Sequence, residues 1–155
     1  MKSEETIEVL NTLITINNFR IIGYESASNI TDEQNLKTLF AQFTATSQNC
    51  KQELKTEVKR LGGIVDETII TFVKLLHIWV DVLKAALLTN DRKVILKSCE
   101  FGEEITVETY FMALRNNTNY ITAEQQIMIN EQHNSIKKDL NTIKAIRDAL
   151  SYSIN

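Results

Sequence analysis

Acidic residues interrupt an otherwise apolar helical stripe between residues 96 and 114. Glu100 and Glu103 share a face with Leu96 and Tyr110, because residues three and four positions apart lie on one side of a helix. A core-facing stripe normally excludes carboxylates, since burying an unpaired charge is very costly. We therefore expect Glu100 and Glu103 to be paired inside the protein with hydrogen-bond donors, a cation or a metal.

A di-metal centre is one chemistry that inward-facing carboxylates could support. Ferritin-type bundles hold their two metal ions with lone glutamates and two Glu-x-x-His elements. Neither histidine of this chain completes such an element, because Lys74 stands three residues before His77 and Asn130 three before His133. A carboxylate-based site for iron or manganese can still be drawn from the remaining oxygen donors, which are Glu25, Glu53, Glu100, Glu103 and Gln132.

A buried polar layer that fixes helix register is the alternative to a metal centre. A fully hydrogen-bonded polar layer disfavours slipped packings and needs no catalytic role. Counting along the predicted helices places several polar residues at similar depth, with Arg20 or Arg147 as a cationic partner. We favour this structural interpretation. The expected layer consists of Asn17, Ser47, Glu100, Glu103, Tyr110 and Gln132.

Nucleophilic and phosphate chemistry have no support in this sequence. No serine or cysteine lies in a turn signature with a matched base, and no glycine-rich loop could hold a phosphate. Cys50 and Cys99 form no metal-type or redox-type pair, and Cys99 adjoins a glutamate that makes it a poor nucleophile. Both cysteines are therefore interpreted as reduced core residues of a cytoplasmic protein.

Charge and hydropathy argue against three further classes of protein. With 17 basic and 20 acidic residues the net charge is −3, whereas a nucleic-acid-binding face is basic. No basic-then-apolar leader opens the chain, so we do not expect export. The most apolar segment, residues 69–88, carries Lys74, His77, Asp81 and Lys84 at helical spacing, which argues against a transmembrane span.

Helical periodicity predicts an all-α single domain over residues 1–155. Proline is absent and there are only four glycines, so helix breakers are scarce. The expected helices cover about 4–27, 31–61, 67–88, 92–115 and 123–152. Asp91 and Thr122 are the predicted N-caps of the last two helices, and the pair Gly62 and Gly63 is the predicted stop of the second.

Helix lengths and loop lengths predict how these helices are arranged. Four of them are each roughly 40 Å long, and short loops join the first to the second and the fourth to the fifth. Each such pair forms an antiparallel hairpin. The segment at about 67–88 is long enough to return the chain along the bundle as an additional apolar crossover helix. This is the topology of a ferritin-like four-helix bundle.

The crossover segment is apolar on more than one face. One helix packed on one bundle buries a single stripe of apolar residues. The apolar residues outside that stripe therefore predict a second partner. The economical partner is a second copy, forming a homodimer through Phe72, Leu76, Trp79 and Leu83. A client helix of another protein fits the same residues. The sequence leaves open which face of the segment is buried within the chain.

Residues 99–104, Cys-Glu-Phe-Gly-Glu-Glu, followed by Tyr110 and Ala113, carry a resemblance to a known family. They resemble the Cys-Glu-x-Gly-Glu-Asp element of a bacterial family of small ferritin-like four-helix-bundle proteins of unknown function. Shorter matches in the same order, including Trp79, extend the resemblance over nearly the whole chain. Phe19 stands where that family usually has an acidic residue, and Ile22 lies near another such position. These replacements weaken a metal site and suggest an extra buried face on the first helix.

The resemblance implies a ferritin-like fold and, by analogy of fold alone, a role in stress. We expect a non-catalytic interaction or stress-associated protein with a buried polar layer and no cofactor. The alternative is a carboxylate-bridged di-iron or di-manganese protein that handles iron or peroxide.

Overall fold

The computed structural model describes residues 2–89 and 91–153 and is all-α over these ranges, as predicted. It consists of five α-helices and one short 3₁₀ helix, η1, that precedes α3. Their bounds are Lys2–Ile30 for α1, Gln34–Arg60 for α2, Ile70–Phe72 for η1, Val73–Thr89 for α3, Arg92–Asn116 for α4 and Ala123–Ser153 for α5. Within the described part of the chain, no helix is both long and apolar enough to cross a membrane.

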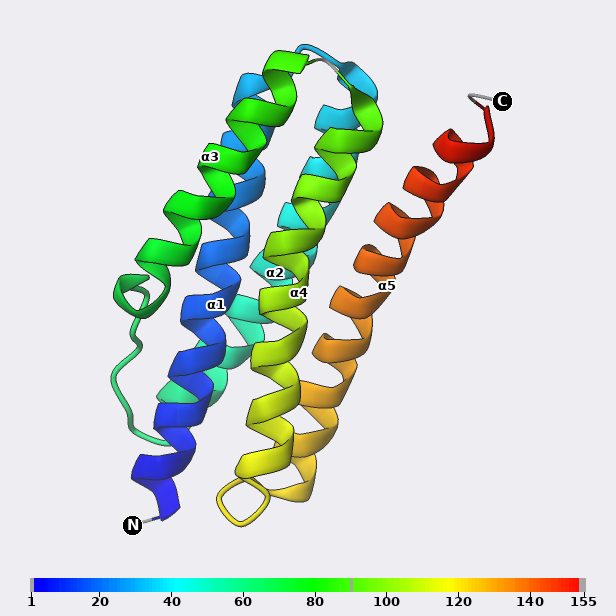
Figure 1. Ribbon diagram of the computed structural model, residues 1–155. Helices are drawn as coiled ribbons and strands as arrows, with labels where there is room; N and C mark the ends of the chain where they lie inside the picture. Colours follow the sequence, from blue (N-terminus) through cyan, green and yellow to red (C-terminus); the bar gives the residue numbers. More distant parts are fainter. Residues whose placement is uncertain (1, 90, 154–155) are drawn as a thin grey trace.

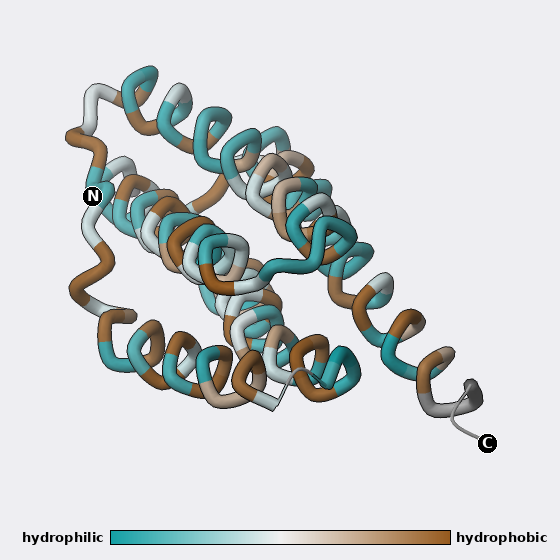
Figure 2. Tube along the Cα trace, turned by 90° about the horizontal axis from the view of Figure 1, so that it is seen from above, coloured by the Kyte–Doolittle hydropathy of each residue, from teal (hydrophilic) through white to brown (hydrophobic). Residues whose placement is uncertain are grey.

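Two antiparallel helical hairpins make up most of the molecule. The first is α1 with α2, and the second is α4 with α5 (Figure 1). Helix α3 joins the hairpins by running lengthwise back along the bundle, where it packs on both α1 and α4. Seen from above, α2 and α3 lie on opposite sides of α1 (Figure 2). Helix α1 is therefore the central helix of the fold.

The predicted helix ends at Gly62, Asp91 and Thr122 are confirmed. The Asp91 carboxylate accepts the backbone N–H of Lys93 at 3.0 Å, as an N-cap does. Thr122 and Gln125 exchange side-chain and backbone hydrogen bonds in a capping box. Gly62 follows α2 with φ of 77°, a left-handed conformation that glycine adopts without strain.

The crossover helix begins later than predicted, because residues 61–69 form an irregular segment. Backbone N–H and C=O groups of this segment form hydrogen bonds with polar side chains of α1, where a helix would bond such groups to one another. Asn11 donates to the Ile64 carbonyl at 2.9 Å and accepts the Asp66 N–H at 2.9 Å. Asn18 donates to the Glu67 carbonyl at 2.6 Å. Figure 2 shows the segment passing from the end of α2 to the start of α3 outside α1.

The residues predicted to form a homodimer contact are all buried within the chain and offer little exposed surface to a partner: Phe72, Leu76, Trp79 and Leu83. A helix that rests in the groove between two others buries a wide arc of its own surface. Helix α3 occupies such a groove, between α1 and α4, and this accounts for much of its apolar excess. The apolar residues that remain exposed between Ile70 and Val82 are Ile70, Val73, Ile78 and Val82.

Trp79 is the central packing residue of α3. Its indole is fully buried, with ring centroids 5.2 Å from both Phe19 and Tyr24. Two glycines make room for it: a Cβ added to Gly23 of α1 or to Gly102 of α4 would lie 2.1 or 2.5 Å from the indole. Phe19 is buried, as expected for an extra buried face of α1, whereas Ile22 is 37% exposed.

Candidate functional site

A fully buried arginine lies at the centre of the bundle. Arg20 extends from α1, and its Nε donates to Glu103 Oε1 of α4 at 2.9 Å. Its Nη1 donates to the Phe43 carbonyl at 2.7 Å and to Ser47 Oγ at 3.0 Å, both on α2. Its Nη2 donates to Asp139 Oδ2 of α5 at 2.9 Å. One guanidinium therefore bonds to the other three long helices.

Inside the protein, Arg20 is bound by the carboxyl groups of both Glu103 and Asp139. Burial alone lowers the pKa of Arg20, but the negative charge of Glu103 and the surrounding groups outweigh burial, so that the pKa is raised. Burial raises the pKa of Glu103, against the opposing effect of Arg20 and of the hydroxyl of Tyr24, which donates to the same Oε1. Glu103 Oε2 is buried without a hydrogen-bond partner among the described residues.

A second polar chain crosses the bundle beside the Arg20 cluster. Asn17 Nδ2 of α1 donates to Tyr110 Oη of α4 at 2.7 Å. Tyr110 Oη then donates to Gln132 Oε1 of α5, also at 2.7 Å. Gln132 Nε2 donates to the Cys50 carbonyl and to Glu53 Oε1 of α2, each at 3.2 Å. This set of hydrogen bonds also connects the four long helices, at positions seven residues after Glu103 on α4 and seven residues before Asp139 on α5.

A third polar contact joins α4 to α5 near the end of the bundle. Arg147 Nη1 lies 2.6 and 2.5 Å from the two carboxylate oxygens of Glu100. Glu100 is 5% exposed, so its charge is matched by a cation at the edge of the core. Glu100 and Glu103 thus use different arginines, one from α5 and one from α1.

The six residues predicted to form a polar layer are all buried, but they lie in three groups. Ser47 and Glu103 bind Arg20, while Asn17, Tyr110 and Gln132 bind one another. Glu100 stands apart with Arg147. Asp139 was not among the residues predicted from the sequence; its signal is its position seven residues after Gln132 on one face of α5.

A family model, described as a domain of unknown function (DUF2383), matches residues 5–116. The chain belongs to the DUF2383 family. The matched region of this DUF2383 chain contains all but the first residues of α1 and the whole of α2, α3 and α4, and with them Arg20, Ser47 and Glu103. Helix α5, which supplies Asp139, lies beyond it. A comparison with curated proteins finds no match.

The oxygen atoms predicted as candidate metal ligands are not arranged as a di-metal centre in this DUF2383 chain. Glu25 and Glu53 are exposed, and Glu100 and Glu103 are each bound by an arginine. In residues 2–89 and 91–153, no group of three or more His, Cys, Asp or Glu side chains is placed to hold a metal ion. The buried guanidinium of Arg20 would also repel a divalent cation beside Glu103.

The two cysteines of the DUF2383 chain lie in the core and are free thiols. Burial raises the pKa of Cys50 to about 11, and burial together with Glu103 and Glu100 raises the pKa of Cys99 further. A nucleophilic cysteine needs the opposite shift, toward the thiolate. The site therefore holds charge and hydrogen bonds in a fixed arrangement and offers no activated nucleophile at these positions.

Proposed function

We propose that this chain is a ferritin-like helical bundle acting as a non-catalytic interaction or stress-associated protein, with an arginine as the internal cation of its core. The observation that carries the proposal is the set of contacts made by Arg20. Its guanidinium reaches Glu103, Asp139 and Ser47, one on each of the other long helices. A charge held by three helices is suited to fixing the bundle in one register.

The path of the chain supports the ferritin-like assignment. Two antiparallel hairpins joined by a lengthwise crossover, with carboxylates of α4 directed inward, are features that such bundles share. In the metal-binding members of that architecture, inward glutamates surround metal ions. Glu103 occupies an inward position of this kind, and Arg20 supplies the positive charge that balances it. The stress association depends on this likeness of fold alone.

Interaction through α3 belongs to the same proposal. Ile70 of η1 is 77% exposed, and Ile78 and Val82 of α3 are 48 and 40% exposed. Exposed apolar residues gathered on neighbouring turns favour a protein partner. The simplest partner is a second copy, in a twofold homodimer. A cytoplasmic location fits the two buried free thiols, which an oxidising compartment does not favour.

Metal analysis of the full chain tests the proposal. The protein is purified without a tag, incubated with ferrous iron, manganese or zinc, desalted and analysed for metal per chain. We expect metal well below stoichiometric in each case, because the inward carboxylates already bind arginines. About two metal ions per chain, as in a ferritin-type centre, lost on Glu103→Gln, would refute the proposal and support iron or peroxide handling. The matched control is Glu104→Gln, which changes an exposed neighbour.

A further inference from the structure

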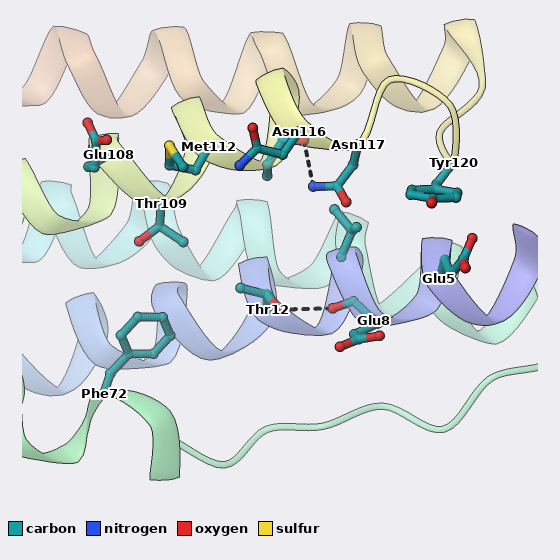
Figure 3. A pocket seen from close by; sticks show the side chains of 12 residues that line it. Glu5, Glu8, Thr12, Phe72, Glu108, Thr109, Met112, Asn116, Asn117 and Tyr120 are labelled. Carbon is teal, nitrogen blue, oxygen red and sulfur yellow. Dashed lines mark hydrogen bonds between the residues drawn. The ribbon is translucent and has the colours of Figure 1, made fainter.

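A cavity of about 520 Å³ opens between the N-terminal half of α1 and the C-terminal half of α4 (Figure 3). Phe72, the last residue of η1, lies toward one end of it, and Tyr120 of the α4–α5 loop lies toward the other. The volume is in the range of small-molecule sites in proteins. None of the buried polar groups around Arg20 lines this cavity.

The cavity exists because α3 is shorter than the helices on which it packs. Helix α3 has 17 residues, whereas α1 has 29 and α4 has 25. It therefore covers only part of the groove between them. The segment that precedes it does not fill the rest, because Asn11 and Asn18 hold that segment along α1. Figure 3 shows it running on the side of α1 away from α4.

Apolar and polar side chains alternate along the walls of the cavity. Val9, Phe72 and Ala113 are nearly buried, while Met112 and Tyr120 are 41 and 36% exposed. Hydroxyl and amide groups lie between these apolar side chains. They belong to Thr12, Thr109, Asn116 and Asn117. A ligand with an apolar body can therefore rest on the walls.

Carboxylates stand toward both ends of the cavity. Glu5 and Glu8 of α1 lie toward the Tyr120 end, and Glu108 of α4 lies toward the Phe72 end (Figure 3). No lysine, arginine or histidine is among the residues that line the cavity, and within the described part of the chain no ion pair to these three glutamates is seen. The charge pattern is complementary to a ligand with a cationic group at each end.

We propose that this groove binds a linear aliphatic polyamine. Its terminal ammonium groups pair with Glu5 and Glu8 at one end and with Glu108 at the other. Its methylene chain lies on Val9 and Met112. An ammonium has several hydrogen-bond donors, so the threonine and asparagine oxygens of the groove can share in its binding. This proposal goes beyond the role of the buried arginine and does not depend on it.

The length of the groove favours a small molecule over a peptide helix. From Glu5 to Thr12 it follows α1 for about 10 Å, or two helical turns. A stable protein interface buries about 800 Å² on each partner, which two turns do not provide. The separation of the carboxylates to the two ends also favours an extended polycation over one metal ion, and no metal-holding group is found in the described residues.

Isothermal titration calorimetry with the full chain and spermidine, at low ionic strength, tests the proposal. We expect saturable binding at one site per chain. Hexylamine, a monoamine with an apolar chain, should bind at least about tenfold more weakly because it satisfies the carboxylates of one end only. Equal affinities for the two amines, or no saturable binding of spermidine to the folded protein, would overturn the proposal.

Charge-neutral variants locate the site. Glu8→Gln and Glu108→Gln should each weaken spermidine binding by about threefold, as expected for partly exposed ion pairs. Glu4→Gln and Glu104→Gln are the matched controls, because they remove the same charge from exposed neighbours on the same helices that do not line the groove. Equal weakening by the controls would mean non-specific attraction and would refute the site.

Met112→Lys gives a second, independent test. Met112 is 41% exposed, so the substitution is compatible with folding, which circular dichroism verifies. The new ammonium lies in the groove and competes for its carboxylates, so spermidine binding should be lost. Spermidine binding unchanged from wild type in folded Met112→Lys would place the polyamine elsewhere and overturn the proposal. Tight binding of a basic helical peptide in the absence of spermidine binding would assign the groove to a protein partner instead.

Discussion

Arg20 and Glu103 form a completely buried ion pair between α1 and α4. Glu103 Oε1 lies 2.9 Å from Arg20 Nε and 2.8 Å from Arg20 Nη2, and both side chains have 0% exposure. In such a pair, desolvation offsets much of the electrostatic attraction. Removing one partner is nevertheless costly, because the other charge stays buried. The pair therefore contributes more to the uniqueness of the fold than to its net stability.

Glu103→Leu should lower the free energy of unfolding by about 1–3 kcal/mol, because Arg20 Nε loses its acceptor while Asp139 still pairs the guanidinium. The double variant Arg20→Met with Glu103→Leu should recover most of that loss, because no unpaired charge remains on either residue. Asp139 is 18% exposed in its side chain and can be hydrated. Urea denaturation followed by circular dichroism measures both. A double variant as unstable as Glu103→Leu would contradict this account.

Gly102→Ala should lower stability by about 1–3 kcal/mol, although alanine is the better helix former. The added Cβ would lie 2.5 Å from the Trp79 indole. Combining the change with Trp79→Phe, which shortens the ring, should give back part of the loss. Thermal unfolding gives the stabilities. Because the chain has a single tryptophan, its fluorescence reports displacement of the indole in Gly102→Ala. An unshifted emission and an unchanged melting temperature would mean that α4 is not in close contact with Trp79.

Protonation of His133 should destabilise the protein in mild acid. Burial, with a smaller effect of Lys137, lowers the pKa of His133, so the folded state favours the neutral ring. The unfolded chain binds the proton at the ordinary pKa of about 6.5. Stability is therefore expected to fall as the pH drops through that value. Urea unfolding at several pH values should show a weaker pH dependence in His133→Gln than in the wild type. His77→Gln, at an exposed position, is the matched control.

Self-association through α3 should depend on the apolar residues that the bundle leaves exposed. If the proposed homodimer forms there, Ile78→Asp and Val82→Asp should shift the sedimentation coefficient to that of a monomer while circular dichroism is unchanged. Trp79→Asp cannot serve as the test, because Trp79 is buried and the substitution disturbs folding. A dimer unaffected by both changes would place the contact on another surface, and a monomeric wild type would remove the homodimer.

Much of the fold could be predicted from local signals. The apolar periodicity of 3.6 residues, the scarcity of breakers and the caps at Asp91 and Thr122 correctly indicated the helices and several of their ends. The irregular segment before α3 was not predicted. Its backbone hydrogen bonds go to Asn11 and Asn18, about fifty residues away, and a local pattern carries no information about such partners.

The interior of the protein shows most clearly what the sequence determines and what only the tertiary structure decides. By itself, the sequence determined that two glutamates lie on a core-facing stripe and therefore need partners, because burial of an unpaired charge is unfavourable wherever the helix packs. Only the tertiary structure decided which partners these are: Arg147 for Glu100, and Arg20 with Tyr24 for Glu103. The angles at which the helices cross and the position of each residue along the bundle select these partners, and a shift of one helical turn would exchange the neighbours. The packing of α3 on α1 and α4 likewise turns Trp79 inward, and the position at which α3 begins leaves the groove beside Phe72 open.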